Sequence, residues 1–174
     1  QSGTGKSALA AMAFARSGQD YKRFEIRDVT AIDLIGLLYE VFYQQKTPPE
    51  SPDKLLTAIV AKWREWRGWL IIDNLQALLN DEQQPRDPDC ATILTALCAS
   101  GLPLLVLGWP DSNVLATKKD KLKKIHLEGL DDRAGVQLLR AEGVKGEPTS
   151  LSLERVVEQL DGNPKMLETL ARLL

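Results

Sequence analysis

The chain opens with QSGTGKSALA, in which two glycines, a lysine and a serine stand directly before an alanine-rich segment. This is the end of the pattern G-x-x-x-x-G-K-S/T, a loop that opens a helix and binds phosphate. Glycines let backbone N–H groups converge on phosphate oxygens, and the helix N-terminus adds a partial positive charge. The feature therefore predicts an α/β fold in which a strand leads into the loop and a helix leaves it.

The pattern lacks its first glycine. Counting back from Gly5, that glycine falls one position before Gln1, and the strand that leads into the loop would lie before it. We therefore expect the sequence to be part of a larger protein in which the first strand and the first glycine precede Gln1. For so short a motif, an ordinary glycine-containing turn before a helix stays the alternative.

A second motif, WLIID, places Asp73 directly after four apolar residues. In proteins that bind Mg²⁺ together with a nucleotide, a carboxylate at the end of a buried strand holds the metal beside the phosphate loop. In that arrangement Lys6 reaches the β and γ phosphates, and Ser7 offers its hydroxyl to Mg²⁺. An aspartate after a strand is by itself often a turn or cap residue, but its combination with Lys6 and Ser7 favours the metal role.

Helix-like and strand-like segments alternate over the first 130 residues. The helical spacing covers 6–17, 32–42, 56–67 and 90–99, and the strand-like runs are 24–29, 69–72, 102–108 and 124–130. Thr30 and Asp33 resemble a capping box. The alternation predicts a parallel sheet covered by helices on both faces. From residue 131 the pattern is purely helical, so we expect a nucleotide-binding domain over 1–130 and a helical lid over 131–174.

Composition narrows the classes of function. The formal net charge of −2 gives no global positive field, so nucleic-acid binding is not indicated. Cys90, Cys98 and the single histidine, His126, lack the spacing of a disulfide framework or a zinc site. No apolar run approaches the roughly 20 residues that span a bilayer, and there is no signal peptide. We therefore expect a cytoplasmic protein without a membrane partner.

The segment TKKD (117–120) matches the short pattern with which GTPases read guanine. In those proteins the pattern directly ends a strand, whereas here it lies several residues beyond 102–108 in a lysine-rich stretch. Asp73 is also not followed by the glycine of the D-x-x-G switch. The sequence therefore argues against guanine recognition.

Four segments in order, GTGKSALA, LIIDNLQALL, IHLEGLDDRAGVQLL and LDGNPKMLETLARLL, resemble the NB-ARC-like branch of the STAND ATPases over nearly the whole chain. The resemblance implies a P-loop NTPase fold, with a three-layer parallel sheet followed by a small helical lid. It also implies an ATP/ADP and Mg²⁺ switch that signals by nucleotide-dependent oligomerisation. The expected partners are effector and sensor (repeat) regions of the same larger chain and, in the activated state, further copies of the protein.

The motifs and the resemblance together assign roles to individual residues. Ser7 and Asp73 would hold Mg²⁺, and Lys6, Asp73 and Asn74 would form the catalytic group. The residues expected to contact the nucleotide are Gly3, Thr4, Gly5, Lys6, Ser7, Ala8 and Pro164. A plain helix–helix turn stays the alternative for the GNPK segment that contains Pro164.

The sequence departs from the family at two places. Residues 109–112 read Trp-Pro-Asp-Ser where members commonly have an arginine that senses the γ-phosphate, and Lys165 follows Pro164 where an apolar residue is usual. In addition, Asn74 follows Asp73 where many fast ATPases have a glutamate, and an amide cannot take a proton from water. We therefore expect ATP hydrolysis to be slow.

Two other functions use the same phosphate loop. One is an AAA+ ATPase of the initiator type that acts on DNA or as a loader, and the other is a small-molecule kinase. No arginine-rich lid follows the second strand, which disfavours the kinase, and no basic domain or winged-helix pattern is present to favour the DNA-acting ATPase. The nucleotide-controlled switch is therefore the leading interpretation.

Overall fold

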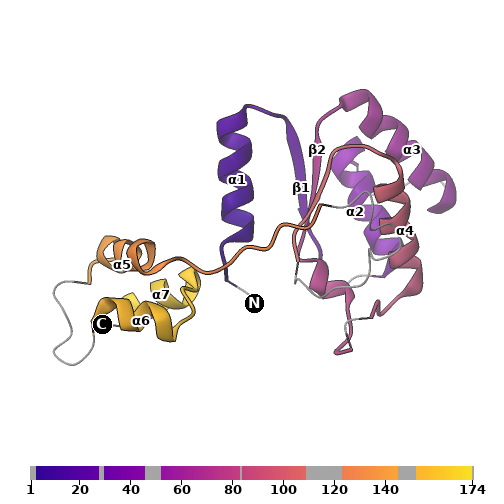
Figure 1. The fold of residues 1–174 in the computed structure, drawn as a ribbon. Helices are drawn as coiled ribbons and strands as arrows, with labels where there is room; N and C mark the ends of the chain where they lie inside the picture. Colours follow the sequence, from indigo (N-terminus) through magenta and orange to yellow (C-terminus); the bar gives the residue numbers. More distant parts are fainter. Residues whose placement is uncertain are drawn as a thin grey trace. The chain divides into compact units, whose positions relative to one another are not determined.

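The computed structural model describes residues 3–27, 30–45, 52–82, 84–108, 123–144 and 152–173. The chain divides into two compact units, which are described separately below (Figure 1). The sheet unit is Ala11–Lys123, and the lid unit joins residues 1–10 to residues 124–174. The division into domains at residue 130 stays a prediction. Among the described residues, no helix is both long enough and apolar enough to cross a membrane.

The sheet unit is built on three parallel strands in the order β1-β2-β3. They are β1 (Tyr21–Glu25), β2 (Trp69–Asp73) and β3 (Leu104–Val106). The predicted parallel sheet is confirmed, but β1 begins earlier than the predicted strand at 24–29, and β3 covers only the middle of 102–108. In the register, Glu25 lies opposite Asp73, so the carboxyl ends of β1 and β2 lie side by side.

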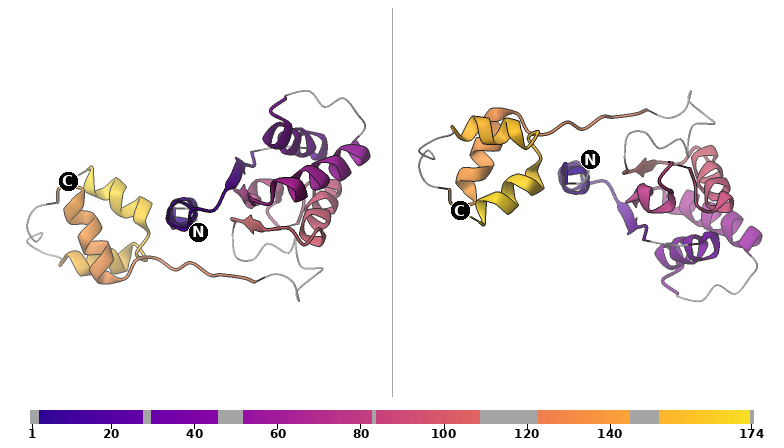
Figure 2. Two further views of the ribbon diagram at one scale, coloured as in Figure 1. Left: turned by 90° about the horizontal axis from the view of Figure 1, so that it is seen from above. Right: turned by 90° about the horizontal axis from the view of Figure 1, so that it is seen from below.

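Helices cover both faces of this sheet. Helices α2 (Ala31–Tyr43), α3 (Pro52–Trp66) and α4 (Pro88–Ala99) lie on one face, as Figures 1 and 2 show. Their apolar residues pack with those of that face in one core, which includes Phe24, Leu70, Ile72, Leu34, Leu38, Ile59, Trp63, Leu94 and Leu97. The second half of α1 (Lys6–Ser17) covers the other face. There the ring of Phe14 lies 5.0 Å from that of Tyr21 and 5.6 Å from that of Trp69.

The predicted capping box at the start of α2 is confirmed. The Asp33 backbone N–H donates to Thr30 Oγ1 over 3.4 Å, and the Thr30 N–H donates to Asp33 Oδ2 over 2.9 Å. Hydrogen bonds from the Thr30 side chain and backbone lower the pKa of the Asp33 carboxyl. A second carboxylate, Asp87, caps α4 by accepting from Asp89 N over 2.9 Å, and it also accepts from Ala31 N over 2.9 Å. One side chain thus satisfies donors at the starts of two helices.

The lid unit contains three short helices, α5 (Asp132–Ala141), α6 (Leu153–Gln159) and α7 (Pro164–Ala171). The purely helical pattern after residue 131 is therefore confirmed. Asp131, Ser152 and Asn163 cap these helices at their N-termini. Between them lies a small apolar core formed by Val136, Leu139, Leu153, Val157, Leu167 and Ala171.

The strand predicted over 124–130 is wrong, because the described residues 123–130 form no strand. The apolar members of this run do not share a buried face: Ile125 is 77% exposed. Its end pairs instead with a turn of the lid, where the Leu130 N–H donates to the Gly162 carbonyl over 2.7 Å. The alternation in the sequence therefore reflects an extended segment that docks on the lid, and not a sheet strand.

Candidate nucleotide-binding site

The loop before α1 contains two glycines with a left-handed backbone. Gly3 has a φ of +86° and Gly5 a φ of +84°, a region that residues with a Cβ rarely adopt. The Gly5 carbonyl accepts the first hydrogen bond of α1, from Leu9 N over 2.8 Å. In a turn, left-handed residues can direct neighbouring N–H groups toward one concavity, which attracts anions. The loop predicted from the sequence is thus formed at the helix N-terminus.

The polar side chains of this loop lie within it. Lys6 Nζ donates to Thr4 Oγ1 over 3.0 Å, so the ammonium group bends back over the loop to which it belongs. Thr4 is buried, Ser7 is half-buried in the first turn of α1, and Ala8 is exposed. The structure therefore brings Thr4, Lys6 and Ser7 together at one helix end, and their contacts with a nucleotide stay a prediction.

The start of α7 lies against the phosphate loop. Lys165 N approaches the Gly3 carbonyl at 3.4 Å, and Pro164 Cγ lies 4.0 Å from the position that a Cβ on Gly5 would take. A Cβ on Gly3 would meet both Asn163 Oδ1 and Lys165 Cβ at 2.8 Å. Only glycine leaves room for this approach. Pro164, identified from the sequence, therefore lies beside the loop, together with Asn163 and Lys165.

A second contact fixes the turn that precedes α7. A Cβ on Gly129 would lie 1.9 Å from the Asp161 carbonyl oxygen, and a Cβ on Gly162 would lie 2.0 Å from that of Leu130. With the hydrogen bond from Leu130 to Gly162, these approaches join the LEGL segment to the DGNPK segment. Three sequence motifs that are far apart along the chain, the phosphate loop, LEGL and DGNPK, thus meet within the lid unit.

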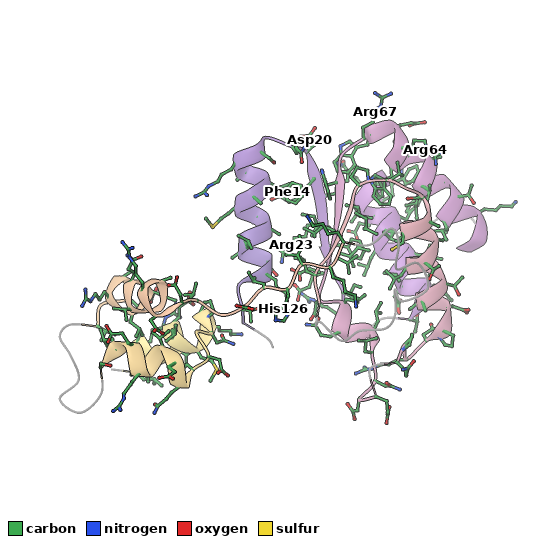
Figure 3. All side chains as sticks on the ribbon, in the orientation of Figure 1. Phe14, Asp20, Arg23, Arg64, Arg67 and His126 are labelled. Carbon is green, nitrogen blue, oxygen red and sulfur yellow. The ribbon has the colours of Figure 1, made fainter. Side chains whose placement is uncertain are left out.

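In the sheet unit, the predicted metal-holding residue Asp73 ends β2 with only 7% of its surface exposed. Its Oδ1 accepts from the backbone N–H of Asn74 over 2.8 Å. Its Oδ2 accepts from Arg23 Nη2 over 2.6 Å, so Asp73 forms an ion pair with a residue of the neighbouring strand β1. Arg23 is labelled in Figure 3. Arg23 was not identified from the sequence, since only the register between β1 and β2 reveals the pairing.

Asn74 has a left-handed backbone with a φ of +66°. Both ends of its side-chain amide form hydrogen bonds within the protein. Nδ2 donates to the Ile26 carbonyl over 2.7 Å, and Oδ1 accepts from Gln76 Nε2. The side chain therefore ties the end of β1 to the short 3₁₀ helix η1 (Leu75–Leu78) that follows β2. Its predicted part in catalysis stays a prediction.

The residues present suit a magnesium–nucleotide complex. Mg²⁺ is usually held by one or two carboxylates together with phosphate oxygens and water, and Asp73 and Ser7 offer oxygens of this kind. Among the described residues, no cluster of three or more His, Cys, Asp or Glu side chains offers a site built from protein ligands alone. Asp73 and Ser7 belong to different units, so a metal shared by them stays a prediction. The TKKD segment and residues 109–112 lie outside the described residues.

Comparison with known proteins identifies the fold. No family model and no curated protein matches the chain. The structure resembles that of the Aeropyrum pernix ORC1 protein in complex with DNA, with a TM-score of 0.60 and 16% identity over 98% of this chain and 50% of that one. It also resembles the Aeropyrum pernix ORC2 protein in its ADPNP–ADP complexes, with a TM-score of 0.56 and 18% identity over 99% of this chain and 53% of that one.

These likenesses show that the chain shares the α/β fold of the two ORC proteins and spans about half the length of each. The α/β class and the loop-containing architecture predicted from the sequence are therefore correct. The solved structures are ORC proteins, so the likeness lends no support to the NB-ARC-like branch.

Proposed function

We propose that this chain is the ATP-binding module of a P-loop ATPase in which the bound nucleotide labels a functional state. The observation that carries the proposal is the contact between the phosphate loop and the start of α7, where Pro164 and Lys165 meet Gly5 and Gly3. A lid that touches the loop in this way can distinguish an occupied loop from an empty one. A plain helix–helix turn would not need this approach.

The chemistry of the loop supports a polyphosphate ligand. The N–H groups of the concave loop and of the first turn of α1 would receive phosphate oxygens. Lys6 would exchange its hydrogen bond to Thr4 for the stronger charge-assisted bonds to phosphate. Lys165, whose Cβ and Cδ lie beside Gly3, adds a second cation close to the loop. Ser7 and Asp73 would hold Mg²⁺, which when bound neutralises phosphate charge.

Turnover is expected to be slow. The residue after Asp73 is Asn74, whose amide has no basic group to take a proton from water. In addition, that amide is already bonded to Ile26 and Gln76. A bound nucleotide that is slowly hydrolysed suits a switch better than a motor that needs rapid turnover.

Two classes of switch stay open, and the solved structures favour one of them. The resembling proteins are ORC1 in complex with DNA and ORC2 in complexes with ADPNP and ADP, which supports an initiator-type ATPase that acts on DNA or as a loader. A signalling switch of the NB-ARC type, with effector and repeat regions and nucleotide-dependent oligomerisation, is the second candidate. Binding of duplex DNA by the intact protein that depends on ATP would favour the first class, and ATP-dependent oligomerisation without DNA binding the second.

The primary test is the Lys6→Ala variant of the intact protein. Loss of the bonds to phosphate should weaken binding of a fluorescent ATP analogue by about tenfold or more, because hydrogen bonds to charged groups are the strong ones. The melting temperature without nucleotide should stay near that of the wild type. Lys54→Ala, which removes an exposed lysine on α3, is the matched control. Normal ATP affinity in a folded Lys6→Ala protein would reject the proposed function.

A further inference from the structure

Asp73 is fully engaged by donors without a metal. Arg23 Nη2 lies 2.6 Å from Oδ2, and the Asn74 N–H lies 2.8 Å from Oδ1. The two partners of the ion pair differ in exposure, with 39% of the Arg23 side chain and 10% of the Asp73 side chain open to solvent. Of the two side chains in the pair, Arg23 is therefore the more exposed and the more easily released into solvent.

The register of the sheet creates this pair. Arg23 lies opposite Ile71, so it shares a face with Asp73 and is its diagonal neighbour, within reach of a long side chain. Glu25 lies directly opposite Asp73 on the same face. Like charges opposite each other on neighbouring strands are unfavourable. Arg23 places a positive charge on the same face, paired with Asp73.

Burial explains why Asp73 needs a partner at all times. A carboxylate that is removed from water without a compensating charge is costly, whereas a guanidinium that returns to solvent from a half-exposed position loses little. When a divalent cation approaches, Arg23 can therefore leave and Asp73 cannot. Release of Arg23 is then part of the free-energy change on metal binding.

We propose that Arg23 is the resident counter-ion of Asp73 and that its displacement sets the Mg²⁺ concentration at which the site binds nucleotide tightly. The proposal rests on the proposed function, since it assigns a regulator to the same site. Arg23 is in this sense a positioning residue, because it acts on the metal through Asp73. The pair keeps the carboxylate neutralised while the site lacks a metal, and it weakens the affinity of the site for Mg²⁺.

The test is Arg23→Gln in the intact protein. A fluorescent ATP analogue is titrated at increasing Mg²⁺, starting from EDTA, and the half-saturating Mg²⁺ concentration is measured. Removal of the competing charge should lower this concentration roughly fivefold, in keeping with the modest strength of a partly exposed ion pair. Binding of the analogue in EDTA should be unchanged. Arg64→Gln is the matched control, since this exposed arginine on α3 precedes the amino-terminal end of β2, whereas Asp73 lies at the carboxyl end.

A second readout is thermal stability. In EDTA, Arg23→Gln lacks the ion pair with Asp73 and should melt below the wild type, whereas Mg²⁺ and nucleotide together should remove most of the difference. Should Arg23→Gln not fold, Arg23→Lys serves as a second variant, since it keeps the positive charge but lacks the planar guanidinium group. Its half-saturating Mg²⁺ concentration should also fall below that of the wild type.

The outcomes separate the two proposals. A half-saturating Mg²⁺ concentration that is unchanged or higher in a folded Arg23 variant, with normal nucleotide binding, would overturn this inference and leave the proposed function intact. Failure of both the wild type and the variant to bind nucleotide at any Mg²⁺ concentration would reject the proposed function and the inference together. A lower half-saturating concentration in the Arg23 variants but not in Arg64→Gln would support both.

Discussion

At the residue scale, the position of the Cys90 thiol in the sheet unit determines its reactivity. Cys90 lies in the first turn of α4 with 1% of its surface exposed. Burial, followed by the negative charges of Asp87, Asp89 and Asp33, raises the pKa of its thiol to about 11. The reactive form of a thiol is the thiolate, so Cys90 is an apolar core residue at neutral pH and not a nucleophile.

This raised pKa predicts a dependence of stability on pH. Because the thiol has its ordinary pKa of 9.0 in the unfolded chain and a pKa of about 11 in the folded state, the folded state holds the proton to higher pH. The stabilisation is fully present below about pH 9 and is lost as the pH rises toward 11. The free energy of unfolding, measured with urea, should therefore fall more steeply between pH 8 and 11 for the wild type than for Cys90→Ala. Cys98→Ala is the control, and parallel curves for all three proteins would contradict the shift.

At the scale of elements, local patterns in the sequence predicted most of the helices. The features that they did not predict depend on pairing between segments that are far apart along the chain. The capping box of Thr30 and Asp33 and the helical lid follow from neighbouring residues, and both were predicted. The run 124–130 alternates like a strand, but its hydrogen bonds go to the turn at Gly162, which no local pattern contains. The pairing of Arg23 with Asp73 could not be predicted for the same reason, because the register of β1 against β2 depends on packing across the sheet.

That turn offers a prediction for the lid. Gly162 has a φ of +60°, and a Cβ there would lie 2.0 Å from the Leu130 carbonyl oxygen. Gly162→Ala should therefore lower the free energy of unfolding by roughly 3 kcal/mol, through backbone strain and displacement of residue 130. Gly18→Ala is the control, since Gly18 has a φ of +65° with nothing within 4 Å, and it should cost only about 1 kcal/mol. Equal losses in urea unfolding would show that the contact with Leu130 has no energetic role.

At the scale of the whole molecule, the residues that the sequence predicts for the site are divided between the two units. The phosphate loop, Pro164 and Lys165 belong to the lid unit, whereas Asp73, Asn74 and Arg23 belong to the sheet unit. The sequence identified members of both groups because each motif is short and local. It could not show that Lys165 lies beside Gly3, or that the Asn74 amide is bonded to Ile26.

The rate of ATP hydrolysis tests whether the absence of a general base at position 74 keeps turnover slow. Asn74→Glu supplies a carboxylate that can act as a general base, which typically contributes about 10²-fold or more. We expect single-turnover hydrolysis by the intact protein to be slow, and the variant to be faster by roughly tenfold, since loss of the bond to Ile26 offsets part of the gain. Asn80→Glu, which changes another half-buried asparagine downstream of β2, is the control. Rapid hydrolysis by the unassembled wild type would contradict the switch mechanism.

The carboxylate of Asp87 also bears on the lifetime of the folded sheet unit. It joins the start of α4 to that of α2 through the Ala31 N–H, across 56 positions of the chain. The entropy of closing so long a loop must be overcome before the contact stabilises anything. The bond to Ala31 should therefore form after the folding transition state, when both helices already lie on the sheet. Interactions that form this late slow unfolding and leave the rate of folding nearly unchanged, so Asp87 acts on how long the native state persists.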